Sequence, residues 1–371
     1  MKFRCERDAL VEALGMAGRA VSNRGGTLTA LTGIRAELTG DRLALTGTDL
    51  ELTITVEIEV NGESDGVVVL PAKLTADIVR ALGDGAVEVT VGDEEAEIVS
   101  GSATFSVLLL APEGFPQQKE AEGEPVSVPT AELARAVKQV VRAASRDETR
   151  SVALTGVLLA AESDGLRLVA TDSYRLALRD LPGLSLLSGE TQVIVPGRAL
   201  SELVRVLGTA DTVEVRLDPG TASFAVDKAG GEKARVTTRL IEAEYPNYRG
   251  LIPSNQPNHL TVGREALLEA VRRVGLMVAS TPTPIRLVTS GDQLELLAIT
   301  PDRGEAREAL SAKYEGDEIT VAFNPEYLLD GIEATTGDEI SIETVDGLKP
   351  AVLRSSDDEG FLYLLMPVRV S

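Results

Sequence analysis

The chain has 371 residues, 43% of them hydrophobic, with 36 basic and 58 acidic residues and a formal net charge of −22. This length suggests two or three domains. The single cysteine, Cys5, excludes an internal disulfide and a cysteine-built metal site. Because the sequence has no run of 18 apolar residues and no apolar N-terminal run, it predicts a soluble, cytoplasmic protein without a membrane partner.

Six segments carry helix signals, and several of them begin with Pro or a capping residue and end near Gly. In chain order they are residues 6–22, 71–83, 129–146, 196–208, 263–279 and 324–337. Between them, apolar and polar residues alternate and turn signals such as Gly92-Asp93 follow, which indicates antiparallel hairpins. The clearest strands are residues 51–60, 87–91, 221–226 and 340–345. The predicted fold class is therefore α+β.

The predicted elements repeat along the chain. Residues 73–80 align with residues 198–205 at an offset of 125, and a looser third copy begins near Leu294. Polar, proline-containing linkers at 116–125 and 251–259 separate the copies. A repeat of this length indicates a duplicated domain rather than a solenoid. We expect three tandem domains, each with two helices packed on antiparallel sheets, at residues 1–122, 123–250 and 251–371.

A Thr-Asp pair ends a leucine-rich strand in the first two copies, as Thr48-Asp49 and Thr171-Asp172. Its recurrence favours a structural turn over a catalytic aspartate. His259 is the only histidine, and no GxxxxGK[ST] loop is present, so the parts for a Ser-His-Asp triad, a histidine-rich metal site or a nucleotide loop are missing. We predict no enzymatic activity, no cofactor and no metal.

Charge is distributed unevenly. The six helical segments carry 13 basic and 11 acidic residues, whereas the rest of the chain carries 23 and 47. On 129–146 a stripe of four cations at spacings of three and four lies opposite the apolar face: Arg135, Lys138, Arg142 and Arg146. Such a stripe is often just a solvated face. Cations at equivalent helix positions in two copies, Lys73 with Arg198 and Arg80 with Arg205, favour a shared cationic surface. At these two positions the third copy has Glu326 and Glu333 instead.

Eight segments, in order along the whole chain, resemble the bacterial DNA polymerase III beta subunit family, the sliding clamps. They are LTGTDLEL (45–52), SRDETRSVALTGVLL (145–159), ATDSYRLA (170–177), IVPGRALSELV (194–204), EYPNYRGLIP (244–253), FNPEYLLDGI (323–332), KPAVLR (349–354) and LMPVRV (365–370). The resemblance implies a head-to-tail homodimer that forms a six-domain ring around double-stranded DNA without sequence specificity. Such a ring confers processivity on the replicative polymerase.

The resemblance also implies three sets of site residues. Those expected to face the DNA are Arg24, Lys73, Arg142, Arg146 and Arg198. Those at the dimer interface are Phe105, Val107, Leu276 and Met277, although intradomain core is an alternative for each. Polymerase, clamp loader and repair proteins would dock short apolar motifs in a pocket formed by Leu154, Thr171, Ser173, Tyr174, Arg175, Leu176, Pro246, Leu251, Pro350, Leu364, Met366, Pro367, Val368 and Arg369. In this pocket, we expect Arg175 and Arg369 to position the polar ends of a peptide.

Two departures from the family pattern concern this pocket, namely Gly250 where a basic residue is frequent and Ser371 beyond the usual ending. Two other functions stay open from the sequence. One is a repeat-built interaction scaffold that does not encircle DNA, and the other is a hydrolase that uses Asp or Glu.

Overall fold

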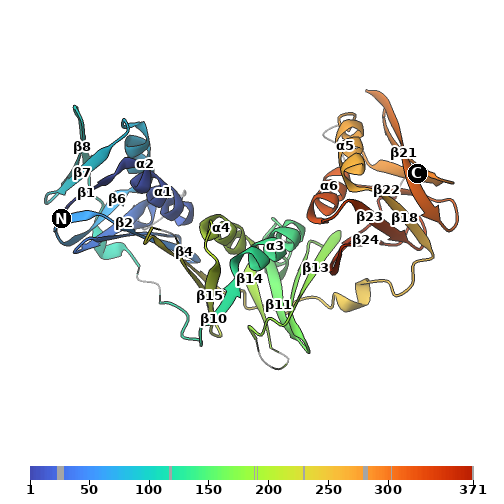
Figure 1. Cartoon of the computed structure of the whole chain (residues 1–371), viewed down its shortest axis with the longest axis horizontal. Helices are drawn as coiled ribbons and strands as arrows, with labels where there is room; N and C mark the ends of the chain where they lie inside the picture. The colour runs from blue at the N-terminus through green and yellow to red at the C-terminus, as the bar shows by residue number, and fades with distance from the viewer. Residues whose placement is uncertain are drawn as a thin grey trace. The chain divides into compact units, whose positions relative to one another are not determined.

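The computed structural model describes residues 1–22, 29–116, 119–187, 189, 191–228, 230–278, 283–301 and 303–369. It contains two compact units, Met1–Ala134 with Arg198–Leu240 (unit 1) and Arg135–Gly197 with Ile241–Ser371 (unit 2). The helices of the described part are α1 (Arg7–Ala17), α2 (Ala72–Ala81), α3 (Thr130–Val140), α4 (Gly197–Leu207), α5 (Arg264–Gly275) and α6 (Pro325–Ala334) (Figure 1). Each lies inside a segment predicted to be helical, so these six predictions are confirmed.

Unit 1 contains two antiparallel sheets. The five-stranded sheet has the order β5 (Asn61–Ser64), β1 (Lys2–Glu6), β7 (Ala86–Val91), β8 (Glu95–Ser100) and β9 (Ala103–Leu108). The eight-stranded sheet has the order β10 (Val126–Pro129), β15 (Thr212–Leu217), β16 (Thr221–Asp227), β17 (Lys233–Arg239), β4 (Leu52–Glu59), β3 (Arg42–Thr48), β2 (Gly33–Thr39) and β6 (Gly66–Pro71). The first and second copies of the repeat meet in this sheet where β17 pairs with β4, with Val236 opposite Ile54.

Unit 2 contains one twelve-stranded antiparallel sheet. Its order is β14 (Gln192–Pro196), β11 (Gly156–Glu162), β12 (Gly165–Thr171), β13 (Arg175–Pro182), β25 (Asp358–Leu365), β24 (Ala351–Ser355), β23 (Glu339–Thr344), β18 (Asn258–Gly263), β21 (Gly304–Glu315), β20 (Gln293–Thr300), β19 (Ile285–Ser290) and β22 (Thr320–Phe323). The second and third copies meet where β13 pairs with β25, with Leu178 opposite Leu362. The four strands predicted from alternation correspond to β4, β7, β16 and β23, which confirms them.

Helices cover the sheets in pairs. In unit 1, α1 packs on β4 and on α2, and it buries Leu10 and Leu14. A Cβ atom added at Gly47 of β3 would lie 2.1 Å from the carbonyl oxygen of Ala17, so this strand needs glycine where the helix backbone approaches it. In unit 2, α5 packs against α6 (Figure 1). Each unit is thus α+β, as predicted.

The compact units differ from the expected domain ranges, because hydrogen-bonded sheets continue from one copy of the repeat into the next. The strands of the second copy are shared between both units. The boundaries 1–122, 123–250 and 251–371 therefore stay a prediction about the repeats. Part of the first predicted linker is ordered in unit 1, since Ala121 is 3% exposed and donates its N–H to Ser223 Oγ at 2.9 Å. None of the described helices has the length and apolar character needed to cross a membrane.

Candidate peptide-binding site and basic helix faces

A tight turn between β12 and β13 positions Tyr174. The carboxylate of Asp172 accepts the N–H groups of Tyr174 and Arg175 at 2.9 and 3.0 Å, and Thr171 Oγ1 donates to the carbonyl of Arg175 at 2.7 Å. Ser173 adopts a left-handed conformation with φ 77°. These local bonds hold the turn in one shape and leave the Tyr174 side chain exposed.

The first copy of the repeat builds the same turn. Asp49 Oδ1 accepts the N–H groups of Glu51 and Leu52 at 3.1 and 2.9 Å, and Leu50 has φ 82°. Thr48 Oγ1 donates to the Leu52 carbonyl at 3.2 Å. The interpretation of Thr-Asp as a structural turn shared between copies is therefore confirmed.

A buried apolar cluster lies beneath the turn in unit 2. Leu176 and Leu364 are 1% and 2% exposed and face each other in the β13–β25 register. Tyr245 and Tyr248 pack into the same cluster from the segment that precedes β18. Leu154 is also buried, on a short 3-10 helix (Val152–Thr155). These buried side chains form the apolar floor beneath the turn.

Above this floor, the C-terminal segment runs beside the turn. The Met366 N–H donates to the Tyr174 carbonyl at 2.9 Å, and the Val368 N–H donates to the Ala322 carbonyl at 2.7 Å. Several of the predicted wall residues in this region leave side-chain surface exposed, which an apolar ligand needs: Tyr174, Pro246, Leu251, Met366 and Arg369 are exposed, and Pro350, Pro367 and Val368 are half-buried.

Arg175 does not present its charge at this surface. Its side chain is only 6% exposed; Nε donates to Asp172 at 3.0 Å and Nη1 to Asp330 at 2.5 Å, and Cζ lies 4.3 Å from the centre of the Tyr327 ring. Burial lowers the pKa of Arg175, but its contacts with Tyr363 and Asp330 outweigh this and raise it. The expectation that Arg175 positions a peptide end is therefore corrected: its guanidinium holds the turn against α6.

Two side chains at the turn were not predicted from the sequence, although both lie in segments that carry the family resemblance. Tyr327 of α6 stacks on Tyr174 with ring centres 6.3 Å apart and planes at 26°. Arg150 Nη1 also donates to the Tyr174 hydroxyl at 3.3 Å, with its Cζ 5.9 Å from the ring centre. Arg150, and not Arg175, is thus the exposed cation beside Tyr174.

The predicted basic residues divide into two groups. Lys73 of α2, Arg135 and Lys138 of α3, and Arg146 are exposed, and none has an ion-pair partner within the described ranges. Arg24 lies outside the residues that the structure describes. Free cations on a helix face are what loose, sequence-independent contact with phosphates requires.

Arg142 and Arg198 instead have carboxylate partners. Arg142 Nη1 lies 3.2 Å from Asp330 and also contacts Glu333. Arg198 contacts Asp49, whose carboxylate shapes the first turn, and donates to the Arg19 carbonyl at 3.3 Å. Both side chains are about half exposed, with 44% and 52% of their surface in solvent. A phosphate would have to compete with these acids.

A strand edge that carries or lies near exposed apolar side chains can be traced in each unit among the described residues. In unit 1, no described strand pairs with the outer edge of β9, where Phe105 and Leu108 are 39% and 71% exposed. In unit 2, β21 pairs with β18 only from Ala312 onward, so the preceding part is paired on one side among the described residues. Leu276, just beyond α5, is 78% exposed.

Two predicted interface residues lie deeper. Val107 is 1% exposed, so its side chain belongs to the core of its own unit, and Leu108 is the exposed apolar residue at that end of β9. Met277 is half-buried, and its carbonyl accepts from Thr300 Oγ1 at 2.7 Å. Among the residues that the structure covers, no cluster of three or more His, Cys, Asp or Glu side chains is arranged to hold a metal ion.

The repeated two-helix domain on continuous antiparallel sheets is the architecture of a DNA clamp, and three such domains follow one another here. Family models for the DNA polymerase III beta subunit match residues 1–119 (N-terminal domain), 127–247 (central domain) and 249–369 (C-terminal domain). The chain therefore belongs to the DNA polymerase III beta subunit family.

Individual relatives match over their full length. The beta sliding clamp of Streptomyces coelicolor is 35% identical, with 100% of both chains covered. The crystal structure of the Bacillus subtilis sliding clamp is 30% identical with a TM-score of 0.90, and that of the Bartonella birtlesii sliding clamp bound to griselimycin is 31% identical with a TM-score of 0.91. Both structural matches also cover 100% of each chain.

Proposed function

We propose that this protein is a DNA sliding clamp, a non-enzymatic homodimeric ring that encircles duplex DNA and gives processivity to the replicative polymerase. The observation that carries the proposal is a set of exposed cations on α2 and α3, namely Lys73, Arg135 and Lys138, that have no ion-pair partner among the described residues of a chain with net charge −22. DNA repels a molecule with this much negative charge. Topological enclosure with few weak phosphate contacts therefore explains how the protein stays bound to DNA and still slides.

The decisive experiment compares circular and linear DNA. The clamp is loaded onto a nicked plasmid with its cognate clamp loader and ATP, and retention on the plasmid is measured by gel filtration. We expect co-elution with the circular plasmid and release after a single restriction cut, because only an open end lets a ring slide off. A restriction enzyme without a site in the plasmid is the control. Equal loss from circular and linear templates would contradict enclosure and favour a scaffold that does not encircle DNA.

Ring formation requires two chains. The open edges of β9 and β21, each beside an exposed apolar residue, support closure by pairing of edge strands between chains. Light scattering should give about twice the 39.2 kDa chain mass. We expect Leu276→Asp to shift the protein towards monomer. Leu348→Asp is the matched control, since Leu348 is 68% exposed on a turn and belongs to neither β9 nor β21. A monomeric wild-type protein would refute the ring.

We further propose that the apolar surface formed by Tyr174, Leu251 and Met366 receives short apolar motifs of polymerase, clamp loader and repair proteins. Burying two or three peptide side chains at about 1.5–3 kcal/mol each, less the cost of ordering the peptide, gives an affinity of roughly micromolar. Partners that take turns on one clamp need such moderate affinity. The binding of griselimycin by the Bartonella birtlesii clamp supports a small-ligand site in this family.

A further inference from the structure

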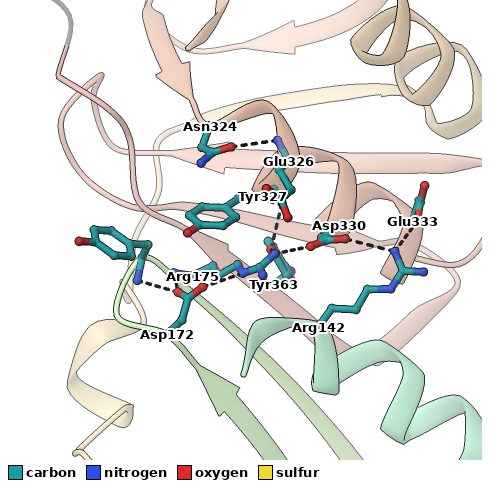
Figure 2. Close-up of polar contacts among 10 residues, drawn as sticks. Arg142, Asp172, Arg175, Asn324, Glu326, Tyr327, Asp330, Glu333 and Tyr363 are labelled. Carbon is teal, nitrogen blue, oxygen red and sulfur yellow. Dashed lines mark hydrogen bonds and ion pairs between the residues drawn. The ribbon is translucent and has the colours of Figure 1, made fainter. Parts of the chain in front are cut away.

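A single carboxylate, that of Asp330 on α6, lies between two arginines from distant parts of unit 2 (Figure 2). Its Oδ2 accepts from Arg175 Nη1 at 2.5 Å, and its Oδ1 accepts from Arg142 Nη1 at 3.2 Å. In the sequence, Arg175 comes directly after the turn at the peptide site, and Arg142 comes just after α3, which carries the basic face. The Asp330 side chain is 21% exposed, so water screens these contacts only in part.

On the first side of Asp330, Arg175 fixes the turn. Besides Asp330, its guanidinium bonds Asp172, the residue that accepts the N–H groups of the turn, and covers the Tyr327 ring. Tyr327 stacks on Tyr174. The strength of the Asp330–Arg175 contact therefore influences how firmly the peptide-site turn is held against α6.

On the second side of Asp330, Arg142 can exchange partners. Its side chain is 44% exposed, and the residue comes just after α3, the helix that carries Arg135 and Lys138. Asp330 and Glu333 are its partners in the described part of the chain. Burial lowers its pKa, but these carboxylates outweigh that effect, so the side chain stays charged. A phosphate oxygen accepts the same kind of charge-assisted hydrogen bond as a carboxylate oxygen, so it competes directly for this guanidinium.

We propose that Asp330 couples the basic helix face to the peptide site, so that a DNA phosphate that takes Arg142 from Asp330 strengthens the hold of Asp330 on Arg175 and stiffens the turn. The inference rests on the proposed function, since it requires DNA at α3. It assigns Asp330 as a positioning residue that contacts neither DNA nor peptide.

The direction follows from the charges. While Arg142 shares the carboxylate, it neutralises part of the charge that Arg175 feels, and the two guanidinium groups repel each other. Removing Arg142 leaves all of the Asp330 charge to Arg175. By linkage, a peptide that needs the stiff turn would then bind DNA-loaded protein more tightly, and DNA affinity would rise by the same factor. Because contacts of partly exposed ion pairs are weak, we expect a factor of about two to five.

Amide hydrogen exchange tests this coupling in the full-length protein. The reporting amides are those of Tyr174 and Arg175, bonded to Asp172, and that of Met366, bonded to Tyr174. A short duplex DNA at a concentration that saturates binding by fluorescence anisotropy should slow their exchange about two- to fivefold. The Thr221 amide is the internal control. Its N–H donates to the Asp218 carboxylate at 2.8 Å in an unrelated turn, and its exchange rate should not change on DNA binding.

Three variants separate coupling from direct contact with DNA. Asp330→Asn should abolish the DNA response of the turn without abolishing DNA binding. Arg142→Gln should slow exchange at the turn even without DNA, because it mimics the released state. Arg272→Gln is its matched control: Arg272 contacts Glu333 at 2.9 Å and has no described contact with Asp330, so the turn should exchange as in wild type.

Each outcome decides the question. If duplex DNA fails to bind at all, both the proposed function and the coupling fall. If DNA binds and the turn does not respond, or if the response persists in Asp330→Asn, the coupling alone falls. If Arg142→Gln and Arg272→Gln change exchange at the turn equally, the stability of the turn does not depend on whether Arg142 shares the Asp330 carboxylate with Arg175. The same reading applies even if Asp330→Asn folds poorly, because the Arg142→Gln measurement requires no DNA.

Discussion

Replacing Arg179 by methionine is expected to lower the free energy of unfolding by about 3–5 kcal/mol, because it strands a buried carboxylate. Arg179 of β13 contacts Asp358 of β25, and both side chains are 7% exposed. Thr336 Oγ1 and Gln139 Nε2 donate to the same carboxylate at 3.2 and 3.4 Å. These two donors reduce the loss, so we expect a value near the lower end, measured by urea denaturation.

A double-mutant cycle gives this prediction its control. Asp358→Asn added to Arg179→Met should recover most of the lost stability, because it removes the stranded charge while keeping an acceptor for Thr336 and Gln139. Arg167→Met is the matched comparison, since Arg167 pairs with Asp180 at 2.6 Å but with 23% and 39% exposure. There we expect a loss of about 1 kcal/mol or less. Additive effects at Arg179 and Asp358 would contradict a coupled buried pair.

The pair also predicts a pH dependence. Burial raises the pKa of Asp358, but the donors Arg179, Gln139 and Thr336 outweigh burial and bring it below its ordinary 3.8. A carboxyl with a depressed pKa in the folded state contributes stability that is fully present above its unfolded pKa and lost as the pH falls through the folded value. In Arg179→Met, the donors that oppose burial are fewer, so the pKa of Asp358 is higher than in wild type. The stability difference between wild type and Arg179→Met should therefore be largest at neutral pH and shrink below a pH of about 4.

Local signals in the sequence were sufficient for the elements and the turns. Asn324 caps α6 by accepting the Glu326 N–H at 2.9 Å, with Pro325 at the first helical position, and both features are legible in the sequence. The Thr-Asp turn was predictable because its bonds join residues at most four apart. Such short-range geometry depends on neighbours along the chain and little on the rest of the fold.

The misjudged residues depend on contacts that sequence spacing does not encode. Arg175 seemed available for a ligand because its carboxylate partner Asp330 is 155 residues away. For Val107 the sequence left both an interface and the domain core open; within the strand it is the buried position and Leu108 the exposed one. The continuation of sheets from one copy of the repeat to the next could not be predicted either, because the local sequence of an edge strand does not indicate which strand pairs with it.

Deleting residues 366–371 is expected to reduce the affinity for an apolar peptide by roughly 30- to 1000-fold, because it removes Met366, Pro367 and Val368 from the site; this range corresponds to about 2–4 kcal/mol of lost apolar contact. The probe is a fluorescein-labelled apolar peptide selected for binding to the wild-type chain, and anisotropy gives its Kd. Strand β25 ends at Leu365, so its pairing with β13 and β24 survives the deletion and the fold should persist.

Two controls make the deletion informative. A shorter deletion of residues 370 and 371 should leave peptide affinity unchanged, and light scattering of the longer deletion should still give the dimer mass. Unchanged affinity in the longer deletion would show that the apolar surface beside Tyr174 is not the peptide site. Loss of the dimer would instead place the C-terminal segment at the contact between chains. The two outcomes are separable because Met366 bonds the Tyr174 turn, whereas the open strand edges belong to β9 and β21.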